Sequence, residues 1–128
     1  MIRPYLNFDG NCEAAFELYR RAFGGEIEYM EKYGAHAPKP EMKDLVRHAE
    51  MRLTETGGLT GGDATWPYEK GGSVNILLRV PEEKAKEAWK VLSQEGVVLS
   101  ELAPFEEGGL MGSLKDKYGF IWIFTVIG

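Results

Sequence analysis

The sequence predicts an α+β fold in which two βαβββ modules form a curved mixed sheet with a concave trough, with the helices on the outer face. The order strand, helix, strand, strand, strand occurs twice, with module one at about residues 1–65 and module two at about 72–128. Alternating apolar residues open each module, and apolar residues at helical spacing follow. Because 128 residues are one domain's worth of chain, we expect a single domain over 1–128.

The first module opens with alternating apolar and polar residues over 2–8, which predicts a half-buried strand. Pro4 cannot donate a backbone hydrogen bond, so this strand should lie at an edge or have an unpaired side there. Asn11 is suited to cap a helix over 12–23, in which Cys12 is expected to be a small core residue. Three further strands are expected at 26–33, 45–53 and 59–63.

The second module repeats this order after a connecting loop over 64–72. Alternation over 74–80 predicts its first strand, and Pro81 opens a helix at the position where proline is best tolerated. Three further strands are expected at 97–102, 110–115 and 120–127. The two modules therefore indicate an internal duplication, which rests on element order more than on sequence identity.

The composition limits the classes of partner. Fifteen basic and twenty acidic residues give a net charge of −5, which disfavours nucleic acid and membrane partners. Cys12 is the only cysteine, so one chain can build neither a disulfide nor a cysteine-based zinc site. The opening residues lack the apolar run of a signal peptide, and no stretch of about 18 apolar residues occurs. We therefore expect a cytoplasmic protein.

Several blocks of the sequence resemble PhnB-like proteins. They are PYLNFDGNC at 4–12, AAF and AFGG within the first predicted helix and its end, HAE at 48–50, GGD at 61–63 and DKYGFIW at 116–122. The resemblance covers essentially the whole chain. It implies a fold of the vicinal oxygen chelate superfamily, which groups glyoxalase, bleomycin-resistance and dioxygenase proteins, and it implies a homodimer. The family also carries the label 3-demethylubiquinone methyltransferase-like.

Enzymes of the superfamily that the chain resembles usually hold one divalent metal ion through His, Gln or Glu side chains in the trough. Mapped onto this chain by the strand and turn motifs, the ligand positions fall near Arg3, Gly62, Asn75 and Ile123. None of these residue types is a good ligand for a divalent ion. A shift of one residue would bring in Asp63 but no complete set. We therefore expect no metal at the usual position and no cofactor.

Methyl transfer from S-adenosylmethionine normally needs a glycine-rich loop between a first strand and a helix. The glycine pairs at 57–58 and 61–62 precede no expected helix, which disfavours that activity.

The strand alternation predicts which side chains line the trough. These are Tyr5, Asn7, His48, Glu50, Arg52, Asn75, Leu77, Arg79, Ile121 and Ile123, with Val46 on the same side of its strand. The helix-covered side should hold Ile76, Leu78, Trp122 and Phe124. The residues expected to bind a ligand are Tyr5, Asn7, His48, Glu50, Asn75 and Arg79.

His48 and Glu50 are two residues apart, so they share one strand face. They can form a catalytic acid–base pair, part of a relocated metal site, or a solvent-facing contact without further role. Asn75 can contact a ligand or make a structural hydrogen bond, and Arg79 can bind an anion or pair with an acid. Trp66 and Tyr68 can form a lid or pack at a subunit interface.

Two functional hypotheses follow. The first is a metal-independent small-molecule-binding protein, built as a homodimer. The alternative is a lyase, isomerase or dioxygenase-like enzyme that acts on a vicinal dioxygen substrate through a divalent metal near His48 and Glu50. A dimeric scaffold with a vestigial cavity is the remaining interpretation.

Overall fold

The computed structural model describes residues 1–65, 69, 71–105 and 108–127. Its internal contacts divide the chain into two compact units. The first unit comprises Met1–Arg20 and Gly24–Glu69, and the second comprises Arg21–Phe23 and Lys70–Gly128. The predicted single domain and the trough between its modules stay predictions. Trp66 and Tyr68, the predicted lid residues, lie outside the described residues.

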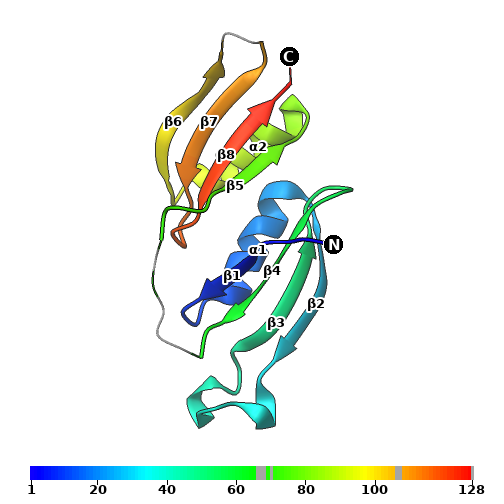
Figure 1. Ribbon diagram of the computed structural model, residues 1–128, viewed down its shortest axis with the longest axis vertical. Helices are drawn as coiled ribbons and strands as arrows, with labels where there is room; N and C mark the ends of the chain where they lie inside the picture. Colours follow the sequence, from blue (N-terminus) through cyan, green and yellow to red (C-terminus); the bar gives the residue numbers. More distant parts are fainter. Residues whose placement is uncertain (66–68, 70, 106–107, 128) are drawn as a thin grey trace. The chain divides into compact units, whose positions relative to one another are not determined.

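The first unit contains one α-helix and a four-stranded mixed sheet in the strand order β1-β4-β3-β2 (Figure 1). β1 is parallel to β4, whereas β3 is antiparallel to both β4 and β2. Two short 3-10 helices lie between β2 and β3, at Gly34–His36 and Pro40–Met42. The main elements are β1 (Tyr5–Phe8), α1 (Cys12–Phe23), β2 (Glu26–Lys32), β3 (Val46–Arg52) and β4 (Gly58–Asp63).

The second unit repeats this topology with the strand order β5-β8-β7-β6. β5 is parallel to β8, and β7 is antiparallel to both β8 and β6. Its elements are β5 (Ile76–Arg79), α2 (Glu82–Ser93), β6 (Val97–Pro104), β7 (Leu110–Lys115) and β8 (Ile121–Val126). The predicted α+β class and the duplicated βαβββ order are therefore confirmed.

Each helix covers one face of a sheet. In the first unit, Phe8 of β1 and Phe16 of α1 are fully buried and meet edge to face, with ring centroids 6.1 Å apart. Cys12 is 0% exposed, as expected for a core residue, and burial raises the pKa of its thiol.

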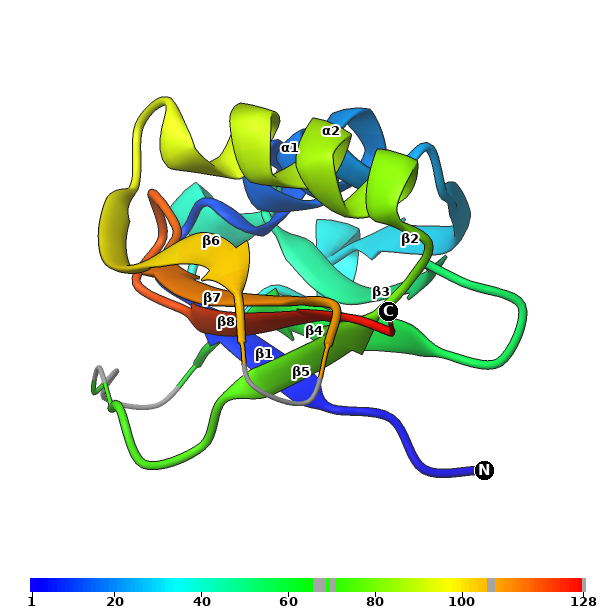
Figure 2. The same ribbon diagram turned by 90° about the horizontal axis from the view of Figure 1, so that it is seen from above.

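In the second unit, α2 lies over one face of the sheet (Figure 2). Trp122 and Phe124 of β8 are both fully buried. Trp89 of α2 contacts Phe124 edge to face at 5.2 Å between ring centroids. Leu78 is also buried and Ile76 is half-buried, so the predicted helix side of these strands is confirmed.

Both first strands begin later than the alternation predicted. Ile2 is 99% exposed and Val74 is 85% exposed, because β1 starts at Tyr5 and β5 at Ile76. Pro4 has no N–H for the ladder, and its carbonyl oxygen instead accepts hydrogen bonds from the backbone and hydroxyl of Thr60. The alternation of apolar and polar residues begins before the first residue that pairs with a neighbouring strand, so it predicted both strands to start too early.

The start of α1 is also capped differently from the prediction. Asn11 makes no side-chain capping hydrogen bond. The Asp63 carboxylate, from the end of β4, accepts the N–H of Cys12 at 3.1 Å instead. Its other oxygen accepts the N–H of Val46 at 2.8 Å, where β3 begins. One buried carboxylate therefore joins the ends of three elements.

The position of Val46 corrects a second prediction. Val46 was expected on the face with His48, yet it is buried with Ala49 and Met51. Glu31 pairs with His48 and Lys32 pairs with Val46, so Arg47 is an extra residue in β3. Because of this bulge, the side chain of Val46 points into the core and not toward the face that carries His48.

The two faces of β5 can be compared by substitution. We expect Leu78→Ala to lower the free energy of unfolding by about 2–5 kcal/mol, because a buried side chain is lost and a cavity remains. Leu77→Ala in the same strand is the control, since Leu77 is 55% exposed and should change stability by less than about 1 kcal/mol. Urea denaturation measures both, and equal losses would contradict the register.

The Asp63 carboxylate should be essential for stability. We expect Asp63→Ala to lower the free energy of unfolding by about 2–6 kcal/mol, because two buried N–H donors each lose a partner at about 1–3 kcal/mol. Asp44→Ala removes an exposed carboxylate of the same unit and should change stability by less than about 0.5 kcal/mol. Equal denaturation midpoints for the two variants would refute this role of Asp63.

Candidate functional site

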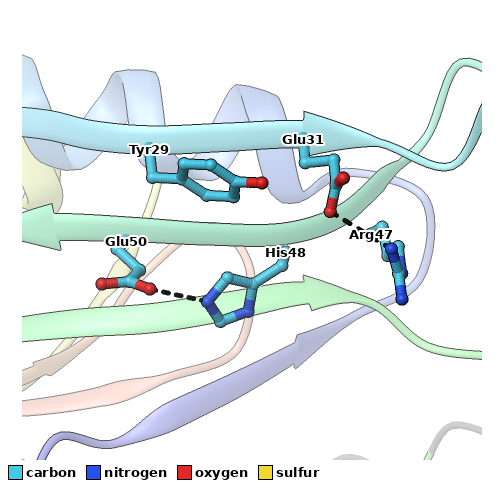
Figure 3. Close-up of a pocket in the computed structure, with 5 residues that line it drawn as sticks. All are labelled: Tyr29, Glu31, Arg47, His48 and Glu50. Carbon is cyan, nitrogen blue, oxygen red and sulfur yellow. Dashed lines mark hydrogen bonds and ion pairs between the residues drawn. The ribbon is translucent and has the colours of Figure 1, made fainter.

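The face of the first sheet opposite α1 contains a hollow, which we call the His48 hollow. It is open to solvent and has a volume of about 490 Å³. Among the described residues, neighbouring strands β2 and β3 line it with Tyr29, Glu31, Arg47, His48 and Glu50 (Figure 3).

The register of β2 against β3 brings these side chains together. Glu50 lies opposite Tyr29, and His48 lies opposite Glu31. His48 and Glu50 also share a strand face, and His48 Nε2 is 2.9 Å from Glu50 Oε2. An ionised carboxylate only accepts hydrogen bonds, so this bond forms in the tautomer that has its proton on Nε2. Two of the predicted site residues therefore form one hydrogen-bonded pair.

Two tyrosine rings flank His48. The Tyr5 ring stacks on the imidazole with centroids 5.9 Å apart and planes 21° apart. The Tyr29 ring lies 6.0 Å from the imidazole on the other side, toward β2. Together with Glu50, these rings restrict the orientation of the His48 side chain.

Gly62 makes room for Tyr5. A Cβ atom at Gly62 would lie 2.7 Å from the Tyr5 hydroxyl and 2.6 Å from the Arg47 carbonyl oxygen. A side chain at this position of β4 would therefore displace Tyr5 from its place beside His48. The absence of a side chain at Gly62 thus contributes to the site.

Burial raises the pKa of the Tyr5 phenol above its usual value, because the phenolate would lose solvation. Nearby ionisable groups raise it further, in the order Tyr33, Cys12 and Asp63. Tyr5 therefore stays a protonated hydroxyl well above neutral pH.

Asn7 lies two residues after Tyr5 on β1. Its Oδ1 atom is buried and has no hydrogen-bond partner among the described residues. A buried amide oxygen normally has a partner, from the protein or from solvent. Asn7 therefore offers an acceptor beside the predicted ligand-binding residues.

The predicted site residues Asn75 and Arg79 belong to the second unit. Asn75 was expected in the middle of an apolar strand, but it precedes β5, is exposed, and its amide donates to the Gly72 carbonyl at 3.2 Å. Arg79 is exposed at the end of β5. A ligand contact for either residue stays a prediction.

The four mapped metal positions do not fit a divalent ion. Arg3 is paired with Glu28 at 3.2 Å, and Ile123 has no donor atom. The space beside Gly62 holds the Tyr5 hydroxyl, and Asn75 is engaged with Gly72. The Asp63 carboxylate is buried and accepts two backbone N–H groups. Within the described ranges, no three His, Cys, Asp or Glu side chains come together as a metal-binding group.

Sequence reasoning missed Tyr29, Glu31 and Arg47. A strand over 26–33 was predicted, but its facing was not assigned. β2 has an irregularity between Ile27 and Tyr29, and β3 has the bulge at Arg47. The polar residues of 26–33 could have suggested a polar face, but only strand pairing places them around His48.

The fold defines the class of protein. A crystal structure from Burkholderia phytofirmans PsJN, described as a glyoxalase/bleomycin resistance protein/dioxygenase family enzyme, superposes with a TM-score of 0.66. It covers 97% of each chain at 12% sequence identity, so it shows the fold alone. This likeness confirms the expected fold.

The chain belongs to the family described as 3-demethylubiquinone-9 3-methyltransferase, whose model matches residues 1–125. The crystal structure of protein PA1353 from Pseudomonas aeruginosa is 30% identical with a TM-score of 0.87, covering 99% of this chain and 97% of that one. A putative 3-demethylubiquinone-9 3-methyltransferase, PhnB protein, from Bacillus cereus is 25% identical with a TM-score of 0.82 and 98% coverage of both chains. Protein YjdN of Escherichia coli (strain K12) is 24% identical, covering 98% of this chain and 95% of YjdN. The PhnB-like resemblance is confirmed.

The raised pKa of Tyr5 predicts a pH dependence of stability. The folded state retains the phenol proton that the unfolded chain releases near the ordinary tyrosine pKa of 10.0. The stability contributed in this way is fully present below that pH and is lost as the pH rises through the folded pKa. We expect Tyr5→Phe, which cannot ionise, to lose less stability than the parent between about pH 9 and about pH 11. Urea midpoints across this range provide the measurement, and parallel curves for the two proteins would contradict the assignment.

Proposed function

We propose that this PhnB-like chain is a small-molecule-binding protein whose ligand occupies the His48 hollow and whose binding requires no divalent metal ion. The observation that carries this proposal is the His48–Glu50 pair, held between two tyrosine rings at the edge of an open hollow. Preorganised polar groups beside aromatic surfaces are typical of small-molecule sites.

The size and the chemistry of the hollow support this proposal. Its volume of about 490 Å³ lies within the range of about 300–1,000 Å³ usual for ligand pockets. Glu31 and Glu50 supply acceptors, Arg47 supplies donors, and the Tyr29 hydroxyl supplies both. With Nε2 bonded to Glu50, a neutral His48 also has an acceptor at Nδ1.

The donor set supports binding without a metal. The residues at the usual ligand positions supply no carboxylate or imidazole donor. A metal relocated to His48 and Glu50 would need a third protein ligand. Glu31, the other carboxylate of the hollow, pairs with Arg47 at 3.4 Å. We therefore derive no catalytic step through a metal ion.

Methyl transfer, the activity in the family's name, does not fit the turn before α1. Such enzymes normally bind S-adenosylmethionine at a glycine-rich loop that leads from a strand into a helix. Here this turn is Asp9-Gly10-Asn11, which has a single glycine.

The homodimer and the cytoplasmic location expected from the sequence stay predictions. Each of the two described α-helices has 12 residues, and neither is long and apolar enough to cross a membrane.

A ligand screen tests the proposed function. We expect some small molecules to raise the thermal midpoint of the parent protein, since a ligand at 100 times its dissociation constant adds about 2.7 kcal/mol. His48→Ala should abolish that shift while leaving the fold intact. His36→Ala is a matched control, because His36 is exposed and does not line the hollow. Equal ligand affinity of His48→Ala and parent would refute this location of the site.

A further inference from the structure

We propose that the ligand of the His48 hollow is a small organic cation, with an alkylammonium group held between the Glu50 carboxylate and the face of the Tyr29 ring. This inference rests on the proposed function and specifies its ligand class. It follows from the charges of this sheet face and from the position of the Tyr29 ring.

The arginines of this face are already paired. Arg3 lies 3.2 Å from Glu28, Arg52 lies 2.9 Å from Glu26, and Arg47 lies 3.4 Å from Glu31. In the described part of the chain, the ion-pair and hydrogen-bond partner of Glu50 is the imidazole of His48. Among the described residues, neither a lysine nor an arginine is paired with Glu50.

The geometry directs the Glu50 carboxylate into the hollow. Glu50 lines it, and its side chain is 39% exposed. Glu31 borders the same space and is 41% exposed, and its contact with Arg47 at 3.4 Å is long for an ion pair. The lining therefore holds two carboxylates and one guanidinium.

An aromatic ring adds a second, independent preference. Tyr29 lies directly opposite Glu50 across the β2–β3 pair, and it remains 47% exposed. The negative faces of aromatic rings attract alkylated ammonium groups, which are also weakly hydrated. The exposed Tyr29 ring beside the Glu50 carboxylate therefore favours a cation over other ligands.

The other ligand classes fit less well. An anion would approach Arg47 but would meet the repulsion of both Glu31 and Glu50. A neutral ligand that covered the hollow would remove water from Glu50 without supplying a countercharge. Because an unpaired charge is costly to bury, its affinity would be reduced. A cation replaces the lost hydration of Glu50 with an ion pair.

The test compares choline with its neutral isostere 3,3-dimethylbutan-1-ol. Titrations of the uniformly ¹⁵N-labelled full chain are followed by the amide shifts of residues around the hollow. We expect saturable shifts with choline and at least about tenfold weaker binding of the isostere, as for the loss of one charged contact. Equal binding of the two probes, or no saturable shift with choline, would overturn the cation assignment.

Two pairs of variants test whether choline contacts Glu50 and Tyr29. Glu50→Gln should weaken choline binding about tenfold, whereas Glu26→Gln, with the same change in net charge on the same face, should change it less than about twofold. Tyr29→Leu should weaken binding about fivefold, and Tyr29→Phe, which keeps the ring face, should restore it. Equal losses of choline affinity in the two glutamine variants would mean that only the net charge of the face attracts choline, and would overturn the contact with Glu50.

The two proposals fail in different ways. Suppose that the parent protein does not bind choline, but that a neutral or anionic compound changes the amide shifts around the hollow and no longer binds to His48→Ala. This result would refute the cationic ligand class and retain the proposed function. Choline binding that His48→Ala leaves unchanged, with shifts away from the hollow, would refute both.

Discussion

The first unit depends on the hydrogen bonds that the buried carboxylate of Asp63 accepts. Its two oxygens accept the N–H groups of Cys12 and Val46, at 3.1 Å and 2.8 Å. These donors begin α1 and β3, and Asp63 itself ends β4. Its backbone carbonyl accepts the Tyr33 hydroxyl, 2.7 Å away and just beyond β2. Because a buried charge is tolerated only with good partners, this arrangement fixes the ends of several elements at once.

The candidate site follows from this constraint. Val46 N is bound by Asp63, and the bulge at Arg47 immediately follows, so His48 and Glu50 turn toward the open face while Val46 turns toward the core. Gly62, next to Asp63, leaves the space in which Tyr5 reaches His48. The structural carboxylate and the residues of the hollow are thus parts of one local arrangement.

The second unit uses a comparable buried carboxylate to different effect. Asp116 accepts the N–H groups of Tyr118 and Phe120 and the indole N–H of Trp122. This fixes the turn before β8 and the largest side chain of its core. On the open face of this sheet, however, Leu77 lies opposite Ile123, whereas the open face of the first sheet carries His48 and Glu50. The duplicated topology therefore conserves the fold of each half, while the surface chemistry of the halves differs.

The sequence by itself determined the element order, both helices, the duplicated topology and the family, because hydrophobic periodicity and turn residues are local signals. It also assigned Tyr5, His48 and Glu50 to one face. Only the tertiary structure decided the rest. The cap of α1 comes from Asp63, about fifty residues away in the sequence, which no local pattern reveals. The bulge at Arg47 reversed the facing of Val46, and the pairing of β2 with β3 brought Tyr29 and Glu31 to the hollow. Strand register depends on hydrogen bonds between distant segments, so alternation within a single strand cannot determine it.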